Sequence, residues 1–154
     1  MAHPLLCWDI VMEGTFRRKE FASDINALQQ LMKVNNWDTI LDRSLDNCII
    51  WENKTILVTN PCLEIVFATK NIYNMNGYRP DEVIGRHPKI FQGEETAKAS
   101  RKHIKIAVEK QQPFGCDIIN YRKDGMLYTC HIEGYPIFNK KGQLVNFIAL
   151  ENAV

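Results

Sequence analysis

The chain has 154 residues, of which 45% are hydrophobic and 24% are charged, and its formal net charge is +1. This length and composition suit one globular domain with an appendage, and a charge so near zero argues against a dedicated nucleic-acid or membrane binder. No apolar run approaches the roughly 18 residues that a membrane span requires.

Five cysteines are spread along the chain, and no two of them form a CxxC pair. An odd number of isolated cysteines is typical of reduced thiols and argues against a disulfide framework or a zinc site. Residues 1–14 lack a basic segment before their apolar part and are interrupted by Asp9, so we do not expect a signal peptide. We therefore expect a cytoplasmic protein without a bound metal.

The N-terminal third predicts helices. Residues 1–16 show no clear period, but from there apolar residues recur at helical spacing, at Phe21, Ile25, Leu28 and Met32. Asn35-Asn36 interrupts this helix. The spacing of Trp37, Leu41 and Leu45 predicts a second, short helix that Asp46-Asn47 ends.

Runs of β-branched and aromatic residues predict the strands. We expect five antiparallel strands near residues 55–59, 63–68, 115–122, 126–135 and 144–151, and a further strand signal lies at Cys48-Ile49-Ile50-Trp51. Lys123-Asp124-Gly125 and the segment 139–142 are hairpin turn signals.

Short helices are predicted between the second and third strands. Residues 71–76 form one that Gly77 ends, and a second begins at Pro80 and ends at Gly85. Residues 96–110 form the longest helix of the second half, with one apolar side and a basic remainder. Because strands and helices are segregated, we expect an α+β fold, an antiparallel sheet with helices on one face.

Three segments in this order resemble the PAS family: NGYRPDEVIGR (residues 76–86), NYRKDGMLY (residues 120–128) and the ending PIF…KG…FIA (residues 136–149). The resemblance implies a PAS fold with the strand order 2-1-5-4-3. It implies a PAS domain at residues 48–154, which leaves residues 1–47 as an N-terminal helical extension. It also implies a non-catalytic sensor or interaction module in intracellular signal transduction, which binds a small ligand or a protein partner.

The segment GRHPKIFQG (residues 85–93) is similar to the LOV branch of this family, in which a cysteine thiol adds to a light-excited flavin. Pro88 stands at the position of that cysteine and has no nucleophilic side chain, which excludes cysteine-adduct photochemistry there. In LOV domains, residues matching Gln92 and Asn120 contact the flavin. Three positions depart from the pattern: Lys89 replaces a phosphate-binding arginine, Cys130 replaces a ring-binding asparagine, and Glu151 replaces a glutamine. The carboxylate of Glu151 would face acceptor carbonyls on the flavin ring.

Because of these departures, we expect a pocket without a tightly bound cofactor, and FMN or FAD in a redox or light sensor is the alternative. His103 lies on the long helix near the edge of its apolar side, and we do not expect haem. Asn120 has the alternative role of bracing the hairpin, and Gln92 that of a loop residue.

Strand alternation and the helix stripe predict the inward-facing side chains of the pocket. They are Ile90, Ile104, Ile118, Asn120, Cys130 and Ile148.

We expect a homodimer through the helix at residues 21–34. The alternative is that this helix folds back on its own sheet, and both arrangements are compatible in a dimer. The sequence contains no P-loop, GxSxG or HExxH motif, so we do not expect an enzyme. The basic face of residues 98–105 lacks interleaved aromatics and is expected to be solvated rather than to bind nucleic acid. The output partner stays unknown at this point.

Overall fold

The structure is a computed structural model that describes residues 4–154. Its first elements are the helices α1 (Pro4–Glu20), α2 (Ala22–Val34) and α3 (Leu45–Ile50). The middle of the chain holds β1 (Thr55–Thr59), β2 (Ile65–Ala68), α4 (Ile72–Asn76), α5 (Pro80–Val83), the 3₁₀ helix η1 (Pro88–Phe91) and α6 (Lys98–Glu109). The last part holds β3 (Phe114–Tyr121), β4 (Leu127–Phe138) and β5 (Leu144–Ala153).

The strands form one antiparallel sheet in the order β2-β1-β5-β4-β3, as the PAS resemblance implied. The predicted first strand has the observed bounds, and the other four differ at their ends by up to three residues. The second strand begins later than predicted because Leu63 has a positive φ of 62°, which places it in the turn.

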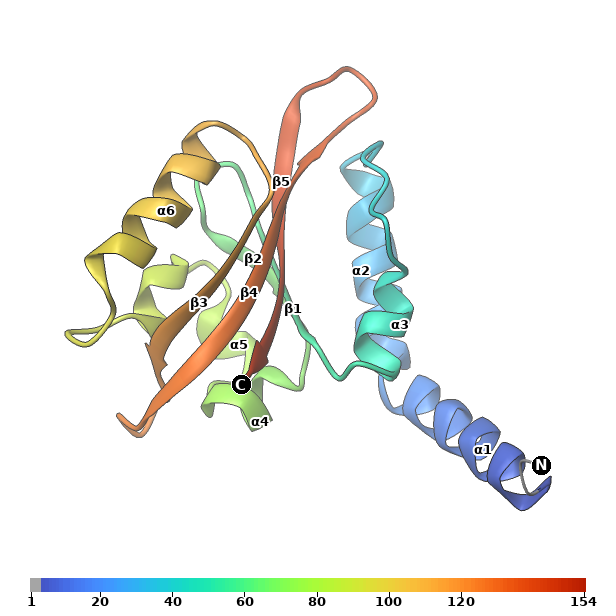
Figure 1. Cartoon of the computed structure of the whole chain (residues 1–154). Helices are drawn as coiled ribbons and strands as arrows, with labels where there is room; N and C mark the ends of the chain where they lie inside the picture. Colours follow the sequence, from blue (N-terminus) through green and yellow to red (C-terminus); the bar gives the residue numbers. More distant parts are fainter. Residues whose placement is uncertain (1–3) are drawn as a thin grey trace.

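The sheet separates two layers of helices (Figure 1). On its inner face lie α4, α5 and α6, and on its outer face lie α2 and α3, while α1 extends away from the body. Because successive side chains of a strand point to opposite faces, each strand contributes to both layers. On β1, for example, Leu57 belongs to the inner cluster of apolar side chains, and Ile56 and Val58 belong to the outer one.

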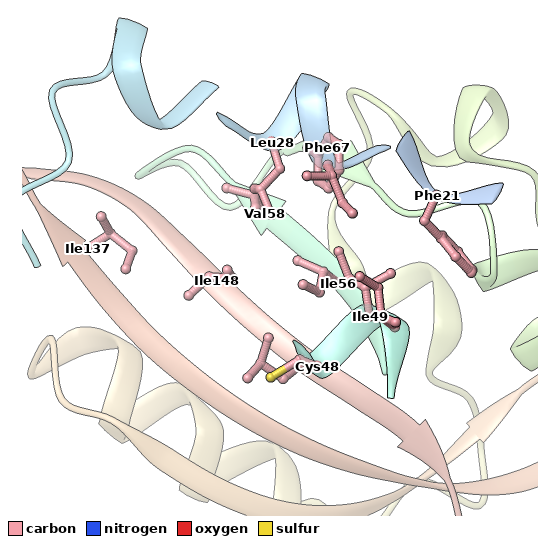
Figure 2. Close-up of a cluster of buried hydrophobic side chains, with 12 residues drawn as sticks. Phe21, Leu28, Cys48, Ile49, Ile56, Val58, Phe67, Ile137 and Ile148 are labelled. Atoms are coloured by element: carbon pink, nitrogen blue, oxygen red, sulfur yellow. The ribbon is translucent and has the colours of Figure 1, made fainter. Parts of the chain in front are cut away.

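The outer cluster is a dry core between α2, α3 and the sheet (Figure 2). Ile49, Ile56, Val58 and Ile148 are fully buried in it. Phe21, Ile25 and Leu28 of the predicted helical stripe are buried here too, against the sheet of their own chain. The stripe therefore folds back, which was the second of the two predicted alternatives.

Residues 1–16 show no clear period in the sequence, yet Pro4–Glu20 form α1, because most of the described apolar side chains of this helix are exposed and leave no one-sided pattern. Two predictions for the N-terminal part are wrong. Residues 37–44 are not helical, because Trp37 pairs with Asn139 in an isolated β-bridge instead.

The second error is the strand signal at residues 48–51, which form the second half of α3 and its C-terminal cap. The Ser44 side chain accepts a hydrogen bond from the Asn47 backbone N–H and so caps this helix. A short apolar run that is buried on all sides has no period that separates a helix from a strand. The predicted domain boundary at residues 47/48 stays a prediction, and α3 spans it.

The two short helices end on glycines as predicted. Gly77 has a φ of 81° and donates its backbone N–H to the Tyr73 carbonyl oxygen, closing α4 in the left-handed conformation that glycine favours. This end matters for the site, because it fixes the adjacent Asn76 in the inner layer.

Candidate ligand-binding site

A cavity of about 930 Å³ lies on the inner face of the sheet. Its floor is formed by the strands, and its other walls by η1, the loop after it and α6. Apolar side chains make up much of the wall: Leu57, Phe91, Ile104, Phe114, Ile132 and Phe147. An apolar cavity with a few polar groups is the usual form of a small-molecule site.

Two places in the cavity wall, at opposite ends of the sheet, have buried polar atoms without hydrogen-bond partners: Thr59 pairs with Phe147 at one end, and Asn120 pairs with Tyr128 at the other. Asn120 and Thr59 line the cavity, and neither the Asn120 Oδ1 nor the Thr59 Oγ1 has a partner. Since buried polar atoms in folded proteins are almost always paired, these atoms indicate places for polar ligand groups.

Two further unpaired atoms lie beside Asn120. They are the Nδ2 of Asn76, whose Oδ1 accepts a hydrogen bond from the Tyr78 backbone N–H, and the Tyr128 phenol oxygen. Burial raises the pKa of the Tyr128 phenol, and the nearby Cys130 and Glu151 raise it further, whereas the amides of Asn120 and Asn76 act in the opposite direction. The phenol is therefore neutral, and it lies against the amides of Asn120 and Asn76 and not in the cavity wall itself.

Glu151 also lines the cavity and is 5% exposed. Its side chain accepts a weak hydrogen bond from the Cys130 thiol, with a distance of 3.7 Å between Sγ and Oε2. No ion pair within residues 4–154 includes Glu151. Burial raises the pKa of this carboxyl to about 7, and the hydrogen bond from Cys130 acts weakly in the other direction.

Another part of the cavity wall is basic. Its cationic side chains come from η1 and α6 and are Lys89, Arg101, Lys102 and Lys105. Pro88 starts η1, and the His87 Nδ1 accepts a hydrogen bond from the Lys89 backbone N–H at 3.0 Å, which fixes this wall. Arg101 donates a hydrogen bond to the Gly93 carbonyl oxygen and so links α6 to the loop. Glu94 and Glu109 line the same side, and Lys105 pairs with Glu109, which leaves an excess of cations that favours an anionic group here.

Five of the nine predicted pocket residues line this cavity with their side chains: Lys89, Gln92, Ile104, Asn120 and Glu151. Ile118 and Cys130 are buried in the inner cluster behind the wall, and Ile90 packs against that cluster without lining the cavity. Gln92 is half-buried and Lys89 is exposed.

The prediction that the Ile148 side chain faces the pocket is wrong. It borders the cavity, but its side chain packs in the outer cluster with Ile56 and Val58 (Figure 2). Ile148 and Glu151 are three residues apart on one strand, so their side chains point to opposite faces and could not both face the pocket. The inward-facing residues of β5 are Phe147, Ala149 and Glu151.

Pro88, which stands at the position of the reactive LOV cysteine, lines the cavity. No cysteine is among the lining residues in the part of the chain that the structure describes. His103 is exposed and does not line the cavity. Within residues 4–154, no three potential ligand residues gather in a way that could hold a metal ion. No helix in the same range is both long and apolar enough to cross a bilayer.

Sequence reasoning missed Thr59, Asn76 and Tyr128. Alternation along β1 could have found Thr59, because Leu57 two residues earlier faces the same way. Asn76 and Tyr128 carry no local signal, since their proximity depends on how α4 docks beside the β3–β4 hairpin.

Comparisons with known proteins agree on one kind of domain. A sequence profile described as "PAS domain" matches residues 53–152. A blue-light-activated histidine kinase of Brucella canis is 37% identical over 97 residues, which cover 61% of this chain and 20% of that protein. Protein TWIN LOV 1 of Arabidopsis thaliana is 35% identical over 98 residues, which cover 61% of this chain and 25% of that protein. The chain thus spans a fifth to a quarter of the length of these relatives.

Solved structures of similar fold include the light-state structure of the blue-light photoreceptor Aureochrome1 LOV, with a TM-score of 0.64 and 25% identity over 72% of this chain and 89% of that one. A structure titled "Flavin Analogue Sheds Light on Light-Oxygen-Voltage Domain Mechanism" has a TM-score of 0.67 and 24% identity, and covers 73% of this chain and 86% of that one. The second likeness is evidence of the fold alone.

Proposed function

The chain belongs to the PAS domain family, and from this premise we propose that it is a non-catalytic sensor module that binds a flavin in the inner-face cavity. The observation that carries the proposal is the cavity with unpaired polar atoms in its wall and an excess of cations on one side. The similarity to a blue-light-activated histidine kinase and to TWIN LOV 1 supports a flavin over other ligands. The sequence favoured a pocket without a tightly bound cofactor, and the flavin sensor proposed here was the alternative.

The residues present fit the parts of a flavin nucleotide. The ring system is planar and largely apolar, and suits a cavity lined by apolar side chains such as Ile104 and Ile132. The polar edge of the ring would meet Asn120 and Glu151, and the phosphate of FMN would meet Lys89 and Arg101. Lysine supplies charge to a phosphate without the bidentate geometry of arginine, so Lys89 alone would hold it less firmly.

We propose that the module senses redox state or light without a cysteine adduct. Pro88 offers no thiol to the cavity, and Cys130 lies behind its wall with a pKa that burial raises strongly. A thiol held neutral is a poor nucleophile, because the thiolate is the reactive form. The bound flavin would supply the redox or light-absorbing chemistry, and this chain's residues would bind and orient it.

A cavity-filling variant tests the proposal. Ala149 lines the cavity, so Ala149→Phe should abolish FMN binding, measured by quenching of flavin fluorescence during titration of the apo protein. Ala99 lies exposed on α6 outside the cavity, and Ala99→Phe is the matched control that should bind like the wild type. Equal binding by both variants would contradict a site in this cavity.

We also propose that the chain forms a homodimer through its N-terminal helices and passes its signal to a protein partner. The stripe at residues 21–34 is buried on its own sheet, so the surface left for a second copy is α1. Trp8 and Phe16 on α1 are 68% and 69% exposed. Trp8→Glu with Phe16→Glu should give a monomer by light scattering, and an unchanged mass would contradict this surface.

The five free thiols support a reducing compartment such as the cytoplasm.

A further inference from the structure

Glu151 is a buried carboxyl that faces a ligand cavity without a cationic partner. We propose that Glu151 selects the ligand by remaining a neutral carboxylic acid that donates a hydrogen bond to an acceptor, a carbonyl oxygen or an imine nitrogen, on the ligand's ring. The proposal rests on the proposed flavin function and deepens it. A neutral Glu151 would make the pocket specific for ligands with hydrogen-bond acceptor atoms on the edge of the ring. It would also make ligand affinity depend on pH.

The geometry supports a donor at this position. Glu151 is 5% exposed, and the Cys130 thiol donates to its Oε2. A carboxylate with only this weak donor would be an isolated buried charge, which is strongly unfavourable. The neutral acid removes that cost and has one O–H donor left for the cavity. The sequence alone suggested a repulsive carboxylate here, but burial gives the residue the donor that a glutamine amide would have.

The surroundings of Glu151 contain few groups that could change this balance. On the sheet, its titratable neighbours are Cys130 and Tyr128 of β4, and burial raises the pKa of both, so both are neutral. The inward-facing residues of β1 and of β3 beside the cavity are Thr55, Leu57, Thr59 and Asn120, which do not titrate. Charged or titratable groups across the cavity are His87, Lys89, Glu94, Arg101, Lys102, Lys105 and Glu109. None of them forms an ion pair with Glu151.

The proposal gives a quantitative expectation. If only the neutral form of Glu151 accepts the ligand, the apparent dissociation constant is the intrinsic one divided by the neutral fraction. With a pKa of about 7 for Glu151, that fraction falls from about nine-tenths at pH 6 to about one-tenth at pH 8. Affinity should therefore fall about tenfold over this range.

Riboflavin is the probe for the test, because it lacks the phosphate of FMN and does not titrate in this range. Its fluorescence is titrated with the apo wild type, Glu151→Gln and Glu94→Gln at several pH values. Glutamine keeps a donor at all pH values, so Glu151→Gln should bind with little pH dependence and with the affinity of the wild type at low pH. Glu94 lines the exposed rim of the same cavity, and Glu94→Gln should keep the tenfold fall.

The outcomes separate this inference from the proposed function. If the wild type binds riboflavin and Glu151→Gln shows the same pH dependence, the selection by Glu151 is wrong and the flavin site stands. If no protein binds riboflavin or FMN at any pH, both proposals are wrong.

A second readout needs no ligand. The infrared spectrum of the apo wild type at about pH 6 should contain a protonated-carboxyl band that Glu151→Gln lacks. Its absence from the wild type would overturn the inference.

Discussion

The two faces of the sheet are built from the same strands but have different interiors. The outer face is covered by α2 and α3 and packed with aliphatic side chains, many of them fully buried. The inner face carries a cavity and buried polar atoms without partners. Because side chains alternate along each strand, one strand contributes to both faces: on β1, Val58 packs in the outer cluster and Thr59 lines the inner cavity. We infer that the outer face supplies stability and that the inner face is shaped for a ligand.

The largest expected effect is on the outer face. Ile56 is fully buried between the sheet and the N-terminal helices, so Ile56→Ala removes packed methyl groups and leaves a cavity. We expect the free energy of unfolding to fall by about 4 kcal/mol, measured by urea denaturation. Ile40 is 93% exposed, and Ile40→Ala is the matched control, with an expected change within about 0.5 kcal/mol. Equal losses would show that the outer face is not the stabilising one.

The next effect concerns pH and the inner face. Burial raises the pKa of Glu151 from the ordinary glutamate value of 4.5 to about 7, so between these pH values the folded protein binds more protons than the unfolded chain. Stability is therefore highest below pH 4.5 as far as this group is concerned, and falls as pH rises until Glu151 is ionised in both states. The total loss should be about 3 kcal/mol.

Urea denaturation of the apo protein at a series of pH values checks this expectation. Glu151→Gln should remove the fall, because the amide does not titrate. A fall of the same size in the variant would assign it to another group.

How much of this was predictable from sequence differs between the two faces. The positions of the strands followed from β-branched runs, which are a local pattern, whereas the strand order followed from the resemblance to the PAS family in motifs such as residues 120–128. The helix α3 was missed because Cys48, Ile49 and Ile50 are buried on all sides and show no period. In the pocket, the expectation that Ile148 and Glu151 both face inward is inconsistent with the alternation of side chains along β5. The proximity of Asn76 to Tyr128 depends on tertiary docking, which no local pattern encodes.

The smallest effects come from two buried threonines with different surroundings. Thr69 Oγ1 accepts a hydrogen bond from the Ile56 backbone N–H at 2.9 Å and donates one to Asn71 Oδ1 at 2.6 Å. Thr59 Oγ1 has no partner. Valine has the same shape, so Thr69→Val should cost about 2 kcal/mol of unfolding free energy, whereas Thr59→Val should raise it by about 1 kcal/mol. Similar losses in both variants would contradict an unsatisfied inner face.

Native mass spectrometry of the whole chain tests the central claim, the flavin site on the inner face, most directly. The protein is incubated with excess FMN, passed through a desalting column and weighed without denaturation. The account predicts a mass increase of one FMN per chain that is absent from Ala149→Phe and present in Ala99→Phe. A chain that keeps only its own mass, or that binds FMN equally well with the cavity filled, would contradict it.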